Sequence, residues 1–353
     1  MKSILITGGA GFIGSHVSEF FAKREDFENI VVIDNLSRGK LLNKDTDNQD
    51  YNWEFLKQYD KIKLYNKDVR NIKFLRKLFS EIKFNVVIHT AAQTAVTTSI
   101  KEPSIDFDNN AVASFNLLET VRKSEQDPVM ILCSTNKVFG NNINQIQISE
   151  KKTRYTFGGK YTNGINEEFS IDLCEHTPYG ASKLCSDLYF QEYGHLYNLK
   201  TAVFRMSCIY GTRQFGVEDQ GWVAHFIISA IKNKKIRIFG DGKQVRDILF
   251  ISDLINAYDA YIDKAGKLKN QVFCMGGGMK NTISLIELIE VLENKLNKKI
   301  KHDFYDWRPS DQKVYISDIS KAKKLLSWKP NISPEEGIDL LVDWVKEKEG
   351  LFH

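Results

Sequence analysis

Long apolar runs, paired cysteines and blocks of like charge are all missing from this 353-residue sequence. Its apolar runs, such as Val129–Cys133, fall far short of the roughly 18 residues that span a bilayer. The N-terminus reaches Thr7 and two glycines before a signal peptide's apolar region of about 7–15 residues is complete. These absences predict a soluble protein in the cytoplasm, with no membrane partner.

The five cysteines are odd in number and form no CxxC pair, which favours reduced thiols over disulfides or a metal-thiolate site, and no metal is expected. The 49 Lys+Arg and 45 Asp+Glu leave a formal net charge of +4. Because the basic residues are spread along the chain, no nucleic-acid partner is expected. What remains is a globular protein, most simply an enzyme, of a length that predicts two domains or one large one.

Short β-rich apolar segments alternate with stretches of helical spacing through the first half of the chain. This alternation predicts βαβ units around a parallel sheet with helices on both faces. Helices are expected at 111–121 and at 179–196, where the apolar spacing fits one helix face. The expected sheet strands are Ser3–Ile6, Ile30–Ile33, Lys61–Leu64, Val86–His89, Val129–Cys133, Thr201–Arg205 and Val245–Phe250.

The second half departs from this rhythm. Segment 141–176 is polar, rich in Asn, Lys and Gly, and without a sustained period, so it is predicted to be a long loop or lid. Helices are expected at Ile283–Leu292 and Pro334–Val345. No internal repeat or low-complexity linker separates the two halves.

Three glycines, Gly8, Gly11 and Gly14, lie between an expected strand and an expected helix. Glycine at these points permits a tight turn and lets the backbone approach a pyrophosphate at the helix N-terminus. Asp34 ends the next strand, where a carboxylate accepts the ribose hydroxyls of NAD and repels the 2′-phosphate of NADP, although Arg38 lies close by. The pattern therefore predicts NAD as the cofactor, with Asp68 and Val69 as candidate contacts to its adenine.

Tyr179 and Lys183 are four residues apart, and hence on one face of the predicted helix. A nearby ammonium favours the phenolate, which is expected to lower the tyrosine pKa and make it a base. Thr135 follows the strand that ends near Cys133, at the sheet edge where open α/β sheets bind ligands. These three residues are the predicted catalytic set.

In these features the chain resembles the extended short-chain dehydrogenase/reductases of the nucleotide-sugar epimerase/dehydratase family over nearly its whole length. The resemblance implies a Rossmann-type α/β fold, a doubly wound parallel sheet with a smaller, interleaved α/β substrate domain. It assigns residues 1–211 and 246–276 to the NAD-binding domain, and 212–245 and 277–353 to the substrate domain. Further matching segments are His89–Ala92, Asn110, Asn116–Glu119, Arg205 to Gly211, Gly240–Asp247 and Arg308–Asp311.

The resemblance also implies the ligand contacts. The implied NAD-binding residues are Gly8, Gly11, Phe12, Ile13, Gly14, Asp34, Asn35, Ser37, Arg38, Asp68, Val69, Ala91, Ala92, Gln93, Asn110, Ser134, Tyr179, Lys183 and Ser207. The implied residues for the nucleotide-diphosphate sugar are Thr94, Thr135, Asn136, Cys208, Arg213, Gln214, Gln220, Val223, Arg246 and Arg308. Among these, Arg213, Arg246 and Arg308 are expected to converge on the diphosphate, because guanidinium groups present planar forks of donors.

Members of this family that dehydrate or decarboxylate their sugar carry acidic residues after the threonine, whereas this chain has Asn136 and Lys137. This difference favours an epimerase that oxidises and re-reduces one carbon with tightly held NAD. Segment 207–223 and Thr135–Lys137 are similar to the CDP-sugar 2-epimerases of the family, which convert CDP-paratose to CDP-tyvelose. Cys208 stands where many relatives have asparagine, and Phe139 where they have tyrosine.

Two other functions remain open at this point. One is a UDP-hexose 4-epimerase or another enzyme acting at the sugar 4-position, and the other is a non-catalytic scaffold that senses NAD. Relatives commonly pair two long helices from each subunit, so a homodimer or homotetramer is expected, with the helices at 111–121 and 179–196 as the contact.

Overall fold

The protein is described by a computed structural model that covers residues 1–41, 50–308 and 311–352. Two compact units divide the chain. The first contains residues 1–138, 177–205 and 255–273, and the second contains residues 139–176, 206–254 and 274–353. Among the described residues, no helix is long and apolar enough to cross a membrane.

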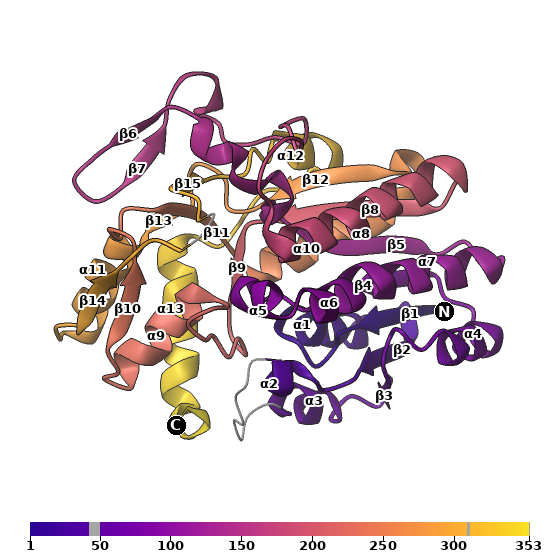
Figure 1. Cartoon of the computed structure of the whole chain (residues 1–353). Helices are drawn as coiled ribbons and strands as arrows, with labels where there is room; N and C mark the ends of the chain where they lie inside the picture. Colours follow the sequence, from indigo (N-terminus) through magenta and orange to yellow (C-terminus); the bar gives the residue numbers. More distant parts are fainter. Residues whose placement is uncertain (42–49, 309–310, 353) are drawn as a thin grey trace. The chain divides into compact units, whose positions relative to one another are not determined.

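The first unit is organised around a seven-stranded sheet with the order β12-β8-β5-β4-β1-β2-β3 (Figure 1). The pairs β1–β2, β2–β3, β1–β4 and β4–β5 are parallel. This topology confirms the predicted Rossmann-type sheet. Its strands are β1 (Lys2–Thr7), β2 (Phe27–Asp34), β3 (Ile62–Asn66), β4 (Val86–His89), β5 (Val129–Thr135), β8 (Lys200–Met206) and β12 (Gln271–Met275).

Helices cover both faces of this sheet because its central strands are apolar on both sides. One face presents Leu5, Val87 and Met130 to the core formed with α4 (Ile72–Glu81), α7 (Ala113–Lys123) and α8 (Thr177–Leu196). On the other face, Phe204 packs edge-on against Tyr258 of α10 (Ile251–Leu268), with ring centroids 4.8 Å apart. The remaining helical segments of this unit are α1 (Phe12–Ala22), α2 (Arg38–Leu41), α3 (Tyr51–Leu56), α5 (Val96–Lys101), α6 (Pro103–Phe107) and the π-helix η1 (Asp108–Val112).

The second unit contains small sheets. Strand β11 (Val245–Phe250) pairs with β9 (Cys208–Tyr210), β13 (Thr282–Ser284) and β15 (Val314–Tyr315), and β10 (Ile236–Phe239) pairs with β14 (His302–Tyr305). The prediction that Val245–Phe250 belongs to the main sheet is therefore wrong. An apolar strand pattern does not specify its partner, and the seventh place in the sheet is taken by β12.

The helices of the second unit are α9 (Trp222–Ile231), α11 (Leu285–Leu296), α12 (Ser320–Leu326) and α13 (Pro334–Glu347), with a short 3-10 helix, η4 (Glu349–Leu351). The start of α11 lies two residues after the predicted one. The Ser284 hydroxyl accepts from the Glu287 amide and the Glu287 carboxylate accepts from the Ser284 amide, a capping box that fixes the first turn.

Segment 141–176 is more ordered than the predicted loop. It begins within the 3-10 segment η2 (Asn136–Gln145) and contains the hairpin β6 (Ile148–Glu150) and β7 (Tyr155–Phe157), followed by the 3-10 helix η3 (Gly159–Tyr161). The order comes from residues distant in sequence. Tyr155 N donates to Lys243 O at 3.0 Å, and Arg154 Nε donates to Glu287 Oε1 at 2.7 Å. The predicted binding domains divide the chain differently from these compact units, and that division stays a prediction.

Candidate functional site

The glycine turn before α1 lies at the carboxyl end of β1. A Cβ on Gly8 would lie 2.5 Å from Ala91 N, and one on Gly14 would lie 2.2 Å from Gly8 O. Gly8 also has φ +73°, a conformation that favours glycine. Gly11 is the N-cap of α1 and offers no side-chain cap, and the first turn contains no acidic residue. The turn therefore leaves the helix N-terminus available to an anion.

Asp34 and Asp68 lie at the ends of the next two strands or just beyond them. Asp34 Oδ2 accepts from Ala10 N at 2.9 Å, which connects the carboxylate to the glycine turn. Burial raises the pKa of Asp34. Asn35 Nδ2 donates to Asp68 Oδ2 at 3.0 Å, and the Arg70 guanidinium lowers the pKa of Asp68 to about 2. The residues predicted for the adenosine half thus form one hydrogen-bonded group of the first unit.

Thr135, Tyr179 and Lys183 are all buried in the first unit, at 8%, 8% and 3% exposure. Thr135 ends β5 and hydrogen-bonds Tyr179 through its side chain. Lys183 Nζ donates to Cys133 O at 2.7 Å. The structure therefore brings the predicted catalytic set together at the end of β5 and the first turns of α8.

The expected lowering of the tyrosine pKa is not seen in the structure. Burial raises the pKa of Tyr179 to about 12, and the Asp106 carboxylate adds to this rise while the Thr135 hydrogen bond opposes it. Burial also lowers the pKa of Lys183. Desolvation disfavours the charged form of both groups, and Lys183 is directed to a backbone carbonyl.

A buried polar cluster that the sequence did not reveal lies beside this set. Gln93 N donates to Asn110 Oδ1 at 2.9 Å, and Asn110 Nδ2 donates to Ser182 Oγ at 2.9 Å. The Ser182 hydroxyl donates to Asp106 Oδ2, while Gln93 Nε2 donates to Asp106 Oδ1 at 2.8 Å. Asn110 lies in the π-helix η1, whose wider turn is common at functional sites. Asp106 was missed because it belongs to no recognisable motif, and Ser182 because the Tyr179–Lys183 motif directs attention to its two end residues.

A second buried group supports the strand that carries Thr135. Ser134 Oγ donates to Asp187 Oδ2 at 3.1 Å, and Arg205 Nε donates to the same oxygen at 2.9 Å. The Asp187–Arg205 ion pair is almost fully buried, with side chains 0% and 5% exposed. Breaking such a pair leaves an uncompensated charge, so it fixes β5, α8 and β8 to one another.

The other predicted residues of the first unit lie along the same strand ends. Phe12 and Ile13 begin α1, Ser37 N donates to Asn35 Oδ1 at 3.1 Å, and Ala91 N donates to Thr7 Oγ1 at 3.4 Å. Thr135 Oγ1 donates to Asn136 Oδ1 at 3.3 Å. Arg38 begins α2, and Val69, Ala92 and Thr94 lie in the segments that follow β3 and β4.

The predicted diphosphate arginines all lie in the second unit, where two of them pair with acidic residues. Arg246 Nη2 donates to Asp311 Oδ1 at 2.8 Å. Arg308 Nη2 lies 2.9 Å from Asp219 Oδ1, and its guanidinium carbon lies 4.0 Å from the centroid of the Phe239 ring. Arg213 is buried with φ +58°. Pro309 and Ser310 of the predicted motif lie outside the described residues.

The remaining substrate-side residues surround the start of α9. Trp222 Nε1 donates to Cys208 Sγ at 3.2 Å, and Gln214 Nε2 donates to Ile209 O at 3.1 Å. Gln220 N donates to Val217 O at 3.0 Å, and Val223 is buried in α9. Ser207, predicted to contact NAD, donates its hydroxyl to Asp247 O at 3.0 Å.

The similarity of this chain to known proteins identifies its family. The profile of the GDP-mannose 4,6 dehydratase family matches residues 5–341. The chain is 37% identical over 346 residues to the CDP-paratose 2-epimerase of Salmonella typhi, covering 97% of this chain and 98% of the relative. The chain belongs to this family of NAD-dependent nucleotide-sugar epimerases and dehydratases.

Other members of the family are also similar to this chain. The UDP-glucuronate 4-epimerase of Thermodesulfobacterium geofontis is 33% identical over 347 residues, covering 98% of this chain and 97% of the relative. The structure of UDP-glucuronic acid 4-epimerase from Bacillus cereus in complex with UDP-glucuronic acid and NAD superposes with a TM-score of 0.81 at 27% identity, covering 98% and 99% of the two chains. The predictions of an NAD-dependent epimerase of this family and of NAD as cofactor are confirmed.

The residues present fit this cofactor. The glycine turn leaves no space for a Cβ at Gly8 or Gly14, as a dinucleotide loop requires. No group of three or more His, Cys, Asp or Glu residues able to hold a metal ion occurs within residues 1–41, 50–308 and 311–352.

Proposed function

We propose that this epimerase inverts C2 of a CDP-sugar, converting CDP-paratose to CDP-tyvelose. The observation that carries an epimerisation is the end of β5, where no carboxylate follows Thr135. Buried Asn136 accepts from the Thr135 hydroxyl, and Lys137 N donates to Thr135 Oγ1 at 3.2 Å. A site arranged in this way has no acid beside Thr135 to expel a second hydroxyl, so the ketosugar is re-reduced.

In this proposal Tyr179 removes the proton of the sugar hydroxyl and later returns it. The Thr135 hydroxyl hydrogen-bonds Tyr179, and in the proposed mechanism it turns its single proton from Asn136 to the phenolate and so stabilises it. The Lys183 ammonium, four residues along the same helix, is proposed to favour the phenolate through its charge. NAD, which the glycine turn and Asp34 would hold, would supply hydride transfer from and back to the sugar carbon.

The choice of C2 and of cytidine is supported by the 37% identity to a CDP-paratose 2-epimerase over nearly the full length. A second candidate, a UDP-sugar 4-epimerase, is favoured by the 33% identity to a UDP-glucuronate 4-epimerase and by the structural likeness to the Bacillus cereus enzyme. Both reactions use the same proton-transfer residues, so they differ in which carbon is presented to Tyr179.

We further propose that Arg246 and Arg308 bind the diphosphate of the nucleotide sugar, together with Arg213. Arg246 and Arg308 now donate to Asp311 and Asp219. A diphosphate carries more negative charge than one carboxylate and accepts a guanidinium fork in two places. Substrate binding is then an exchange of partners at these arginines.

The experiment is incubation of the NAD-loaded enzyme with CDP-paratose in deuterated water. Inversion at C2 without deuterium at C2 is the expected result, because the same hydride leaves and returns. Deuterium at C2 excludes direct hydride return. A parallel panel tests UDP-glucose and UDP-glucuronic acid. If either is turned over and CDP-paratose is not, the 2-epimerase proposal is rejected in favour of a UDP-sugar 4-epimerase.

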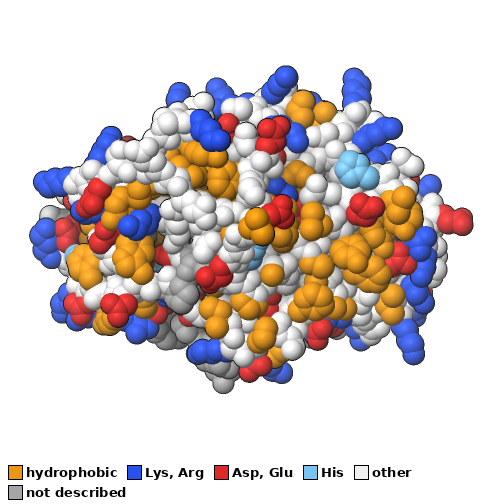
Figure 2. Space-filling model, turned by 45° about the horizontal axis from the view of Figure 1, so that its top comes forward, with side chains coloured by type: hydrophobic (Ala, Val, Ile, Leu, Met, Phe, Trp, Pro, Cys, Tyr) orange, Lys and Arg blue, Asp and Glu red, His pale blue; other side chains and the backbone are white. Residues whose placement is uncertain are grey.

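We also propose that two copies associate through α7 and α8. These helices pack side by side and expose large apolar residues, namely Phe115, Leu188, Tyr189 and Leu196. Figure 2 shows hydrophobic side chains gathered over the part of the surface where these helices lie in Figure 1. Surface apolar residues clustered in this way are typical of an interface.

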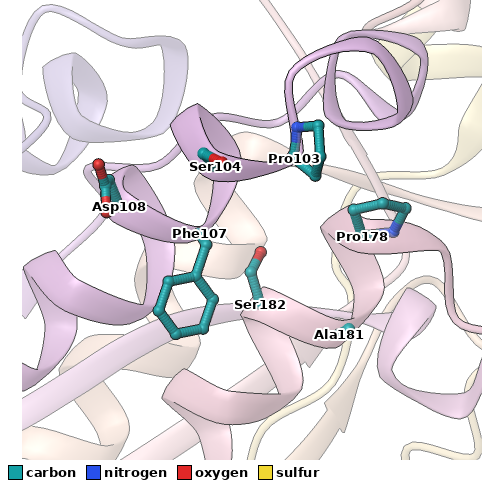
Figure 3. Close-up of a pocket in the computed structure, with 7 residues that line it drawn as sticks. All are labelled: Pro103, Ser104, Phe107, Asp108, Pro178, Ala181 and Ser182. Atoms are coloured by element: carbon teal, nitrogen blue, oxygen red, sulfur yellow. The ribbon is translucent and has the colours of Figure 1, made fainter.

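A pocket of about 510 Å³ lies between Pro103 and Phe107 of α6 and Ala181 of α8 (Figure 3). Light scattering is expected to give the mass of a dimer or tetramer, and Leu188→Glu to shift it toward the monomer. The matched control is Leu340→Glu, because Leu340 of α13 is similarly exposed, at 42% against 47%. A monomeric wild-type protein contradicts the proposal.

A further inference from the structure

We propose that Asp106 is a positioning residue of the reaction, whose buried carboxylate holds the Ser182 hydroxyl and thereby fixes the turn of α8 that carries Tyr179 and Lys183. Asp106 is 1% exposed, although α6 lies at the surface and most of its residues are exposed. Ser182 lies immediately before Lys183 and three residues after Tyr179. A hydrogen bond to Ser182 therefore acts between the two residues that handle the proton.

The hydrogen bonds around the Asp106 carboxylate form a closed set. Asp106 Oδ2 accepts from Ser182 and Oδ1 accepts from Gln93, while Asn110 donates to Ser182 and to Gln93 O at 3.1 Å. This set joins α6, η1 and α8 to the strand-end segment after β4. Buried networks of this kind fix geometry when every member has a partner.

A neighbouring carboxylate provides an internal comparison. Asp108 lies two residues further along the chain and is exposed, at the edge of the pocket shown in Figure 3. Two residues are only a little more than half a helical turn, so the two side chains leave the helix in different directions. An effect common to both variants is therefore due to net charge alone, whereas an effect confined to Asp106 is due to the buried cluster.

The charge of Asp106 also acts on the proton-transfer pair. Two titratable groups act on Tyr179, namely Asp106 from α6 and Cys133 from β5. Lys183 is acted on by the same two groups and by Asp187 of its own helix. His89 from β4 also interacts electrostatically with Lys183. Asp106 raises the pKa of Tyr179 and that of Lys183. Neutralising Asp106 therefore lowers both, and the phenolate forms at a lower pH.

The first experiment measures kcat, KM and the pH profile of the NAD-loaded enzyme for the variants Asp106→Ala, Asp106→Asn and Ser182→Ala. This kinetic part rests on the proposed function, because it uses CDP-paratose. Asp106→Ala and Ser182→Ala are each expected to lower kcat by about 10- to 100-fold with little change in KM, because a misplaced proton-transfer group loses its aligned geometry. The double variant Asp106→Ala/Ser182→Ala is expected to have a kcat no lower than that of the less active single variant, because both substitutions remove the same hydrogen bond.

Asp106→Asn separates position from charge. The amide donates to Ser182, which then donates to Tyr179 O, 3.1 Å away, so the connection is kept. Most of kcat is therefore expected to return, with the acid limb of the pH profile shifted to lower pH. Asp108→Asn is expected to leave the profile unchanged. Independent, additive losses in Asp106→Ala and Ser182→Ala, or equal profiles for the two Asp→Asn variants, overturn the proposal.

The second experiment needs no sugar. The ultraviolet absorbance of tyrosinate is titrated in the NAD-loaded protein, and the contribution of Tyr179 is obtained by subtracting the curve of Tyr179→Phe in the same background. The Tyr179 midpoint is expected at lower pH in Asp106→Asn and unchanged in Asp108→Asn. If wild type fails to turn over CDP-paratose, the proposed function fails, and this titration still decides the role of Asp106. An unmoved midpoint in Asp106→Asn rejects it.

Discussion

The two units hold their functional side chains in different ways. In the first unit Thr135, Tyr179 and Lys183 are buried and are fixed by hydrogen bonds to neutral groups and backbone. In the second unit Arg246 and Arg308 are held by carboxylates, Asp311 and Asp219. Under the proposed function, the proton-transfer residues are thus held by neutral partners, whereas the arginines proposed to bind the diphosphate would exchange one anion for another. Changes in the first unit should alter rate, and changes in the second should alter affinity.

The largest effect is expected from Tyr179→Phe. Removing the phenol should lower kcat by about 10²- to 10⁴-fold, the usual contribution of a positioned acid–base group. NAD binding, measured by fluorescence quenching, should persist. The control is Tyr193→Phe in the same helix, whose hydroxyl donates to Glu119 at 2.7 Å away from the catalytic set. Full turnover by Tyr179→Phe removes this residue from the mechanism.

Gly14→Ala should weaken NAD binding by about 10- to 100-fold, because the new methyl group would lie 2.2 Å from Gly8 O and push the turn apart. Calorimetric titration with NAD measures this loss. Gly266→Ala, in α10 with no atom within 4 Å of the added Cβ, is the matched control and should bind NAD normally. Equal affinity in the two variants contradicts a pyrophosphate site at the turn.

Arg308→Ala should raise KM for the nucleotide sugar about tenfold with kcat nearly unchanged, because a charged hydrogen bond is lost in ground and transition states alike. Arg237→Ala is the matched control, since both arginines pair with Glu218 and lie over the Phe239 ring. A larger effect on kcat than on KM would contradict the expectation that changes in the second unit alter affinity and not rate.

The smallest effect concerns the stability of the first unit below neutral pH. Burial lowers the pKa of His89 to about 3 from 6.5, so the unfolded chain binds a proton first as the pH falls. Stability should therefore decrease below about pH 6.5, by about 1.4 kcal/mol at pH 5.5 from this residue. Urea unfolding at pH 7 and 5.5 measures this, and His89→Gln should remove that part of the decrease. The exposed His195→Gln should keep it; if both variants behave alike, His89 is not responsible.

The sequence alone predicted those parts of the fold that depend on short, local sequence patterns. Glycine spacing, the strand ending at Asp34 and the four-residue interval from Tyr179 to Lys183 are each local, and the structure places them at one end of the main sheet. The partner of Val245–Phe250 and the order in segment 141–176 depend on contacts with residues far along the chain. No periodicity within those segments contains that information.

Asp106 illustrates the same limit within the site. Asp106 and Asp108 are two residues apart in a polar stretch that follows Pro103, and nothing in their local sequence separates a buried carboxylate from an exposed one. The difference arises from the direction each side chain takes from the helix. Its importance becomes visible only when Ser182, 76 residues away, is brought against it.

The chain enters and leaves the first unit repeatedly, so that this unit is assembled from three separate stretches of sequence. During synthesis the first 138 residues emerge long before β12, whose arrival near residue 271 covers the edge of β8. Until then an unpaired strand edge is open to other chains, a known route to aggregation. A truncation that stops before residue 271 would therefore be expected to yield an insoluble product, although all three residues of the proposed catalytic set would be present.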